Sequence, residues 1–174
     1  IRACVKTFGD KIPQVAVFDT SFHQTLEPRA YMYALPYKYY EKYGVRKYGA
    51  HGTSHKYISD RCAVMENKDK KDLKIVTCHL GSGCSISAVK DGVCFDTSMG
   101  FTPVGGLIMG TRCGYIDPGV ISFIASKENL STAEWWDLIN KSSGVAGMSG
   151  VSSDMRDVRT ARDNGNERAA LALE

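Results

Sequence analysis

Three short runs of β-forming residues follow one another closely, and no other feature limits the possible folds as strongly. The runs are KIVTC at 74–78, SISAV at 85–89 and VCFDT at 93–97. The pair Asp91-Gly92 between the last two runs is typical of a two-residue hairpin turn. The sequence therefore predicts an antiparallel three-strand meander over these runs.

Helix signals follow the predicted sheet after a glycine-rich loop at 98–116. Asp117-Pro118 is predicted to cap and begin a helix, because proline is favoured at the first helical position. Ser131 and Glu134 have the spacing of a capping box, which predicts the start of the next helix. Two more helices are expected, over 153–165 and from 166 to the end. Strands followed by helices indicate an α/β or α+β layered domain.

The chain before the sheet is predicted to be less regular. Residues 1–8 indicate a short helix ended by Gly9, and the apolar run VAVF at 15–18 has the length of a strand. The tyrosine-rich stretch at 27–48 is irregular, with a short helix expected at 37–43.

A longer helix is expected after the motif GTSH, capped by Thr53 or Ser54. Its residues Ile58, Cys62 and Met65 fall at i, i+4 and i+7. This face of the helix is therefore predicted to pack inward.

The composition excludes several classes of function. The 174 residues are 43% hydrophobic, which is enough for one globular domain or for pieces of two. Scattered basic residues and a net charge of +3 do not favour a nucleic-acid partner. No apolar run approaches the roughly 18 residues of a membrane span. Because no signal peptide opens the chain, we expect it in the cytoplasm.

Both ends of the chain indicate a piece of a longer protein. The first residue is Ile1, and IRACVKTFG has the pattern of the end of an element. The last stretch, NERAALALE, has the pattern of a helix cut short. We therefore expect a fragment.

The six cysteines are predicted to be reduced thiols, several of them in the core, because none forms a CxxC pair. Cys84 alternates in phase with Ile86 and Ala88, which predicts that this face of the strand packs into the core. The alternative is a zinc site. His51 and His55 lie four residues apart, but no acidic partner follows as in HExxH, so no metal ligand is predicted.

Glycines surround the turn between the first two predicted strands. In such a turn, successive backbone N–H groups can point into one concavity and bind an anion. Gly81, Ser82 and Gly83 fit this use, with His79 beside them. The alternative is an ordinary wide hairpin loop, which is the favoured interpretation when this motif is taken alone, because glycine and serine are common turn residues.

Three further polar residues lie in short glycine-rich or threonine-rich interruptions of apolar runs. Arg112 lies in MGTRCG, where its guanidinium could bind two phosphoryl oxygens, or could be a surface loop residue. His51 lies between glycines in GAHGTSH and is either a ligand contact or a turn histidine. Asp19 follows the run at 15–18, at the end of a strand where α/β sites lie, or serves as a cap.

Taken together, these groups match what phosphoryl transfer requires, namely cations and donors around the phosphoryl group and a carboxylate. The chain has no GxxxxGK[ST] motif, which excludes the P-loop class. It also has no HRD or DFG motif, which excludes the protein kinases.

Five motifs in this order are similar to signatures of the acetate kinase family. They are VAVFDTSFHQT, KYGAHGTSHKY, CHLGSGCS, DTSMGFTPVGGLIMGTRCG and GVSSDMRDV, and they cover nearly the whole chain. The family belongs to the sugar kinase/Hsp70/actin superfamily. The resemblance implies an incomplete α/β domain of the actin-like ATPase (ribonuclease H-like) fold, in which the first hairpin binds the phosphates of ATP.

The resemblance also implies the activity and the site residues. The family transfers a phosphoryl group reversibly between ATP and acetate with Mg²⁺, which gives acetyl phosphate and ADP. By motif, Asp19 is the catalytic carboxylate, and His51 and Arg112 stabilise the transferring phosphoryl group. The remaining assignments are His79, Leu80, Gly81, Ser82 and Gly83 for ATP phosphates, Asp154, Met155 and Arg156 for the nucleoside, and Ala50 and Pro103 for the acetate pocket.

The chain departs from the family pattern at three positions. Ser82 stands where asparagine is usual, Ala50 where phenylalanine is usual, and Gly105 where glutamate is usual. The change at Ala50 puts the size of the acid in question. Three alternatives therefore stay open. The protein could be a propionate or butyrate kinase of the same family, a non-catalytic nucleotide-binding fragment or a purely structural fragment.

The resemblance implies an organisation and partners as well. Residues 1–25 correspond to the end of a first domain, 26–48 to the connection and 49–174 to most of a second, nucleotide-binding domain. The expected partners are acetate, ATP and a second copy in a homodimer, with no nucleic acid and no membrane.

Overall fold

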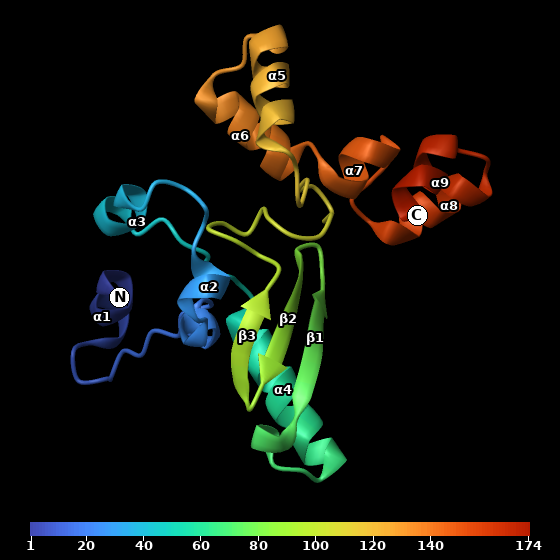
Figure 1. Ribbon diagram of the computed structural model, residues 1–174. Helices are drawn as coiled ribbons and strands as arrows, with labels where there is room; N and C mark the ends of the chain where they lie inside the picture. The colour runs from blue at the N-terminus through green and yellow to red at the C-terminus, as the bar shows by residue number, and fades with distance from the viewer.

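The computed structural model describes residues 1–174 and consists of a small sheet with helices around it. The helices are α1 (Arg2–Phe8), α2 (Pro28–Tyr31), α3 (Lys38–Tyr43), α4 (Gly52–Glu66), α5 (Pro118–Glu128), α6 (Thr132–Lys141), α7 (Gly144–Ser149), α8 (Met155–Asp163) and α9 (Glu167–Leu173). The 3-10 helices η1 (Ser21–Thr25) and η2 (Lys70–Asp72) precede the strands β1 (Lys74–Leu80), β2 (Cys84–Lys90) and β3 (Val93–Thr97). The sheet and α4 lie together at one end, α5 and α6 lie together at the opposite end, and α7, α8 and α9 form a separate group (Figure 1). None of the helices has the length and apolar character that a membrane span requires.

The predicted meander is confirmed. The three strands pair antiparallel in the order β1-β2-β3. Asp91 and Gly92 both adopt left-handed backbone angles, with φ of 56° and 79°, as a two-residue hairpin turn between twisted strands requires. Leu80 pairs with Cys84, so the glycine-rich connection between β1 and β2 spans only residues 81–83.

The predicted helix starts after the sheet are confirmed, and one helix was not predicted. The side chain of Asp117 accepts a hydrogen bond from the backbone N–H of Gly119, and Ser131 and Glu134 form the complete capping box. Asp154 caps α8 in the same way. The short α7 has no side-chain cap, which leaves no signal for it in the sequence.

The predicted cap of α4 is wrong. The helix begins at Gly52 with His51 as its N-cap, and neither Thr53 nor Ser54 caps it. The first N–H groups instead donate to Asp19, a residue far away in the sequence. The carboxylate Oδ2 of Asp19 accepts from the N–H of His51 at 2.6 Å, and its carbonyl oxygen accepts from the N–H of Gly52 at 2.8 Å.

The predicted inward face of α4 is also wrong. Ile58 and Met65 are exposed, and Cys62 is only half-buried. The buried positions are Gly52, His55, Ser59 and Ala63.

The chemistry of the sheet surface explains which face of α4 is buried, because the buried face of the sheet is polar. Within β2 the buried residues are Ser85, Ser87 and Val89, whereas Cys84, Ile86 and Ala88 are half-buried on the other face. The face of Cys84, which was predicted to pack into the core, is therefore only half-buried, although Cys84 itself packs against a small core cluster. Hydrogen bonds between α4 and the strands stabilise this polar interface, because buried polar groups need hydrogen-bond partners.

The apolar run at 15–18 does not form a strand. Val15 and Phe18 are 84% and 67% exposed. A strand needs a partner for its backbone groups, and the three strands of this chain pair only with one another. Residues 15–18 therefore lack, within this chain, the partner strand that they would need to form a strand.

Two small apolar clusters support the loops and the last helices. Ala50, Met99 and Met109 form one cluster, with Cys84 packed against it. Val145, Val158 and Ala169 form the other, which joins α7, α8 and α9. The first cluster includes Met99 and Met109 of the loop that carries Arg112, and the second includes Val158 of the helix that Asp154 begins.

All six cysteines are free, as predicted, but most of them are not core residues. Cys94 is buried, whereas Cys4 and Cys78 are exposed and the other three are half-buried. Burial raises the pKa of the Cys94 thiol to about 12. The thiol lies 3.1 Å from Nδ1 of His23.

We expect Cys94 to be unreactive in a native thiol titration in which Cys4 and Cys78 react rapidly. Burial excludes the reagent, and the raised pKa leaves almost no thiolate, which is the reactive form. After denaturation without reductant the count should rise to six. The control is Cys94→Ala, which should lower the denatured count by one without changing the rapid native count. A rapid native count that falls in this variant would contradict the prediction.

Candidate active site

Asp19 joins the N-terminal segment to the start of α4. Besides its two hydrogen bonds to the helix N-terminus, its carbonyl oxygen packs so closely on Gly52 that a Cβ there would clash. His51 adopts a left-handed φ of 57°, which few residues with a side chain adopt and which is common at functional sites. The arrangement places the Asp19 carboxylate at a helix N-terminus, where the helix dipole favours negative charge.

All four histidines of the chain lie close together beside this junction. The rings of His51 and His79 stack with their centroids 4.0 Å apart. His55 lies edge-on to His79 at 6.4 Å and to His23 at 6.0 Å. The Nδ1 atom of His79 shares a hydrogen bond of 2.9 Å with the hydroxyl of Ser54. The N-terminal segment, α4 and β1 therefore meet at one cluster of imidazoles.

Burial lowers the pKa of three of these rings, His23, His51 and His55. The shifts of His51 and His55 concern the hairpin. Burial lowers the pKa of His51, and the neighbouring His79 and Arg112 lower it further, while Asp19 opposes the shift. Burial lowers the pKa of His55 to about 4, with smaller contributions from the other histidines. Both rings are therefore neutral at neutral pH in the free protein.

Gly83 explains why the first hairpin carries glycine. A Cβ at this position would lie 3.1 Å from Nη1 of Arg112 and 3.4 Å from Nε2 of His51. The missing side chain thus lets both groups converge on the tip of the hairpin. The loop that carries Arg112 also contacts this tip, because the N–H of Gly110 donates to the carbonyl of Ser82 at 3.0 Å.

The guanidinium of Arg112 is half-buried and has no carboxylate partner. Its Nη1 donates to the carbonyl of Pro103 at 3.4 Å and, weakly, to the sulfur of Met109 at 3.8 Å. A half-buried cation without an ion pair, next to backbone N–H groups of a glycine turn, suits an anionic ligand with oxygens on several sides.

On the other side of the hairpin lies a hollow of about 730 Å³. Leu80, Gly81 and Ser82 line it from the hairpin, and Asp154 and Met155 line it from the start of α8. This volume is within the range of about 300–1,000 Å³ that small-molecule sites occupy. The fold thus brings together two predicted nucleotide motifs that are far apart in the sequence.

Not every predicted residue lines this hollow. His79 and Gly83 face the histidine cluster and Arg112 instead. Arg156 lies outside the hollow and forms an ion pair with Asp154. Hydrogen bonds from Arg156 lower the pKa of Asp154 to about 2, so this carboxylate stays charged at neutral pH.

The two residues assigned to the acid pocket have different surroundings. Ala50 is buried against Met99 and Met109, and its carbonyl lies 2.9 Å from Nε2 of His23. Pro103 is exposed and contributes its carbonyl to Arg112. The methionine side chains occupy the space beside Ala50.

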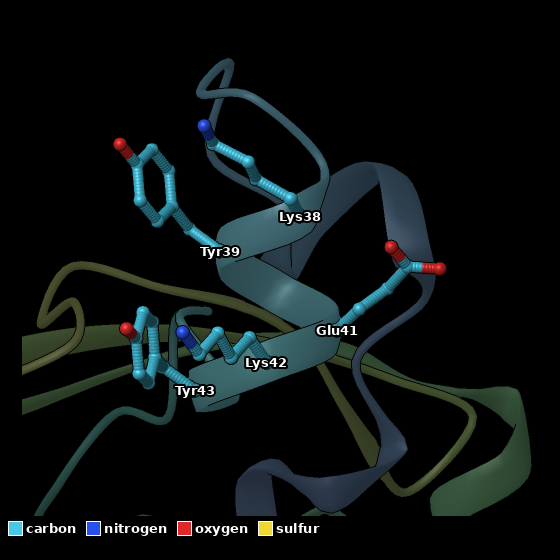
Figure 2. Close-up of a pocket in the computed structure, with 5 residues that line it drawn as sticks. All are labelled: Lys38, Tyr39, Glu41, Lys42 and Tyr43. Carbon is cyan, nitrogen blue, oxygen red and sulfur yellow. The ribbon is translucent and has the colours of Figure 1, made fainter.

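A second hollow, of about 450 Å³, lies on the surface of α3 (Figure 2). The five residues that line it are Lys38, Tyr39, Glu41, Lys42 and Tyr43. The rings of the two tyrosines stack at 6.5 Å, and each has a lysine ammonium near its face. All five come from one helix and none is a predicted site residue, so this hollow is separate from the candidate site.

Comparison with known proteins identifies the family of the chain. The Acetokinase family matches residues 1–174. The chain belongs to the acetokinase family. Its α/β arrangement, with a three-strand antiparallel sheet and surrounding helices, is part of the actin-like ATPase fold of this family.

Several acetokinase relatives are similar over the whole chain but are much longer. An acetate kinase of Methanosarcina barkeri (strain Fusaro / DSM 804) is 63% identical over 174 residues, which are 100% of this chain and 42% of the relative. An acetate kinase of Desulfitobacterium hafniense (strain DSM 10664 / DCB-2) is 60% identical, over 100% of this chain and 43% of the relative. The chain therefore spans less than half the length of these relatives.

Solved acetokinase structures superimpose closely on the chain. The crystal structure of Porphyromonas gingivalis acetate kinase matches with a TM-score of 0.94 and 50% identity, over 99% of this chain and 43% of that one. A propionate kinase from Francisella tularensis subsp. tularensis SCHU S4 matches with a TM-score of 0.92 and 46% identity, over 99% and 44%.

Sequence reasoning missed several polar residues of the candidate site. Ser85 contacts both His51 and His55, and Thr77 contacts His55 from β1. The alternation of serine and threonine along the strands was the available signal, since it marks one polar face. Arg159 on α8 also lines the large hollow and was not predicted, although it lies only five residues after Asp154.

Proposed function

We propose that the protein containing this chain transfers a phosphoryl group reversibly from ATP to acetate, with acetyl phosphate and ADP as products. The observation that carries the proposal is the convergence of Arg112 and His51 on Gly83 at the tip of the hairpin. Phosphoryl transfer depends on donors and cations held around the transferring group, and these two side chains are held in this way.

Each element of the site has a role in this proposal. Arg112 and His51 stabilise the charge on the transferring phosphoryl group, and the hairpin at 79–83 binds the phosphates of ATP. The nucleoside occupies the hollow between this hairpin and α8, where Asp154 and Met155 contact it. The charged guanidinium of Arg159 in the same hollow adds a donor for the nucleotide. Asp19 supplies the catalytic carboxylate.

The proposal includes Mg²⁺, which would bind together with ATP. No group of three histidine, cysteine, aspartate or glutamate residues in the chain is arranged to hold a metal ion by itself. Magnesium is usually bound by one or two carboxylates together with substrate phosphates, and Asp19 fits this use because its carboxylate is exposed. Bound there, the ion would neutralise charge on the phosphates.

The decisive experiment uses a full-length chimera in which this chain replaces the matching segment of the Desulfitobacterium hafniense relative. We expect the chimera to form acetyl phosphate from ATP and acetate, measured as the hydroxamate. The chain alone should form none, because its Asp19 follows an apolar run that has no partner strand, and positioning is most of the catalysis in this chemistry. A folded chimera without turnover would contradict the proposed function, and turnover by the chain alone would contradict the fragment hypothesis.

Two other hypotheses have distinct outcomes. A non-catalytic nucleotide-binding fragment would bind ATP in a titration and form no acetyl phosphate in either preparation. A purely structural fragment would bind no nucleotide. The structural match to a propionate kinase supports a related acid as an alternative substrate. Propionate and butyrate should therefore be tested in the same assay.

We expect the chimera to use propionate nearly as well as acetate, because Ala50 replaces the larger phenylalanine of the family pattern. One methylene in an apolar pocket is worth only about 1–3 kcal/mol, so a small gain in space removes much of the discrimination. In Ala50→Phe the kcat/KM for propionate relative to acetate should fall about tenfold or more.

The result depends on how far the side chains of Met99 and Met109 already fill the space beside Ala50. If the unchanged chimera prefers acetate by about 100-fold, or if Ala50→Phe leaves the ratio unaltered, the enlarged pocket is refuted. A thermal melt of the variant checks that the larger ring is accommodated.

The arrangement of the whole protein is also part of the proposal. Residues 1–25 would end a first domain, 26–48 would connect and 49–174 would form most of a second domain. The exposed Phe123 and Trp136 on α5 and α6 support association as a homodimer. The cytoplasm is the expected location, where ATP and organic acids meet.

A further inference from the structure

A ladder of hydrogen bonds links His51 to the interior of the sheet. Nδ1 of His51 lies 2.8 Å from Oγ of Ser85, and Nε2 of His55 lies 2.7 Å from the same oxygen. Nδ1 of His55 lies 2.8 Å from Oγ1 of Thr77. His55, Thr77 and Ser85 are all buried, so water does not compete for these groups.

The hydroxyl of Ser85 couples the two imidazoles. A hydroxyl has a single hydrogen, so it can donate to only one of the two ring nitrogens and must accept from the other. If His51 donates from Nδ1, then neutral His55 accepts at Nε2 and carries its own proton on Nδ1. If His51 accepts at Nδ1, both rings carry the proton on Nε2. The two histidines therefore share one tautomer.

Thr77 decides between the two tautomers. Its hydroxyl donates to the carbonyl oxygen of Ser87 at 3.3 Å, and a carbonyl can only accept. With its hydrogen used there, Thr77 accepts from Nδ1 of His55. The same direction then runs through Ser85 to His51.

We propose that His55, Ser85 and Thr77 are positioning residues that hold neutral His51 with its proton on Nδ1 and its lone pair on Nε2, toward Arg112 and the hairpin tip. One consequence rests on the proposed function. In the free protein, Nε2 of His51 is then a hydrogen-bond acceptor beside the hairpin tip, where the phosphates of ATP are proposed to bind.

The groups around His51 agree with a ring that is neutral in the free protein. Burial, then His79, Arg112 and His23, lower its pKa, and Asp19 raises it. His55, on the same helix, is also neutral, because burial lowers its pKa to about 4.

Long-range proton–nitrogen NMR of the chimera labelled with ¹⁵N-histidine reads the tautomers directly. We expect His51 and His55 to show the pattern of a proton on Nδ1 in the free protein at neutral or mildly basic pH. Single His→Gln variants assign the signals. A pattern with the proton on Nε2 at either ring would overturn the proposal.

Variants of the ladder separate this role from general support of the fold. Ser85→Ala and Thr77→Val should release His51 to a mixture of tautomers, whereas Thr77→Ser, which keeps the hydroxyl, should preserve the single pattern. The matched control is Ser87→Ala. Ser87 lies on the same face of β2, but its hydroxyl pairs with Thr97 and not with a histidine. An unchanged His51 pattern in both Ser85→Ala and Thr77→Val would also overturn the proposal.

Activity provides a second and independent readout. Ser85→Ala should lower kcat by about 10–100-fold, the usual cost of losing a residue that orients a functional histidine. Thr77→Ser, which keeps the hydroxyl, should retain a kcat close to that of the unchanged chimera. A Ser85→Ala variant with an unchanged kcat would contradict the inference. If the NMR patterns are as expected but no acetyl phosphate forms, the proposed function fails and the tautomer assignment stands.

Discussion

Replacing Arg112 by alanine is expected to lower kcat of the full-length chimera about 10³-fold or more. Arginines that stabilise a transferring phosphoryl group contribute about 10³–10⁵ to turnover. Arg112 is half-buried, unpaired by any carboxylate and held against the hairpin tip, so its charge is available to a ligand. Arg112→Lys should not restore turnover, because an ammonium cannot bind two oxygens in a fork.

The control for Arg112 is Arg162→Ala. Arg162 pairs with its neighbour Asp163 on α8, and such exposed pairs contribute little. Turnover by either Arg112 variant within about tenfold of the unchanged chimera would refute the role, since one decade is only ~1.4 kcal/mol of barrier. Thermal melts of the three variants show whether a loss of activity reflects a loss of fold.

Asp19→Asn is expected to lower kcat by about 10²–10⁴-fold while leaving the fold intact. The Oδ2 atom of Asp19 accepts from the N–H of His51, and an asparagine carbonyl can accept the same hydrogen bond. The substitution therefore removes the negative charge without removing the tie to α4. Asp19→Ala removes both and should also lower the melting temperature.

Asp10→Asn is the matched control for Asp19, because Asp10 is an exposed carboxylate of the same N-terminal segment. We expect it to leave kcat and the melting temperature unchanged. An active Asp19→Asn enzyme would restrict Asp19 to a structural role, that of anchoring the N-terminal segment on α4. Equal melting temperatures for Asp19→Ala and Asp19→Asn would contradict the anchoring role.

Local features were predictable from the sequence because their causes lie within a few residues. The turn at Asp91-Gly92 needs left-handed backbone angles that these residues adopt readily. Asp117, Ser131 and Asp154 cap helices through N–H groups two or three residues away. The motifs around Arg112 and the first hairpin were equally visible, because glycine, histidine and arginine in short polar interruptions indicate an anion site wherever the fold places them.

The tertiary structure decided what the chain could not specify locally. The buried face of α4 is the one with His55, Ser59 and Ala63, because the facing sheet surface offers hydroxyl groups and not an apolar layer. The run at 15–18 lacks a strand partner within these residues, so its strand propensity is unsatisfied.

The ladder through Ser85 and the convergence of Arg112 and His51 on Gly83 depend equally on contacts between distant segments. Sequence periodicity shows which residues share one face of a helix or strand. Which face is buried depends on the chemistry of the surface that packs against it. That surface forms only when the chain folds.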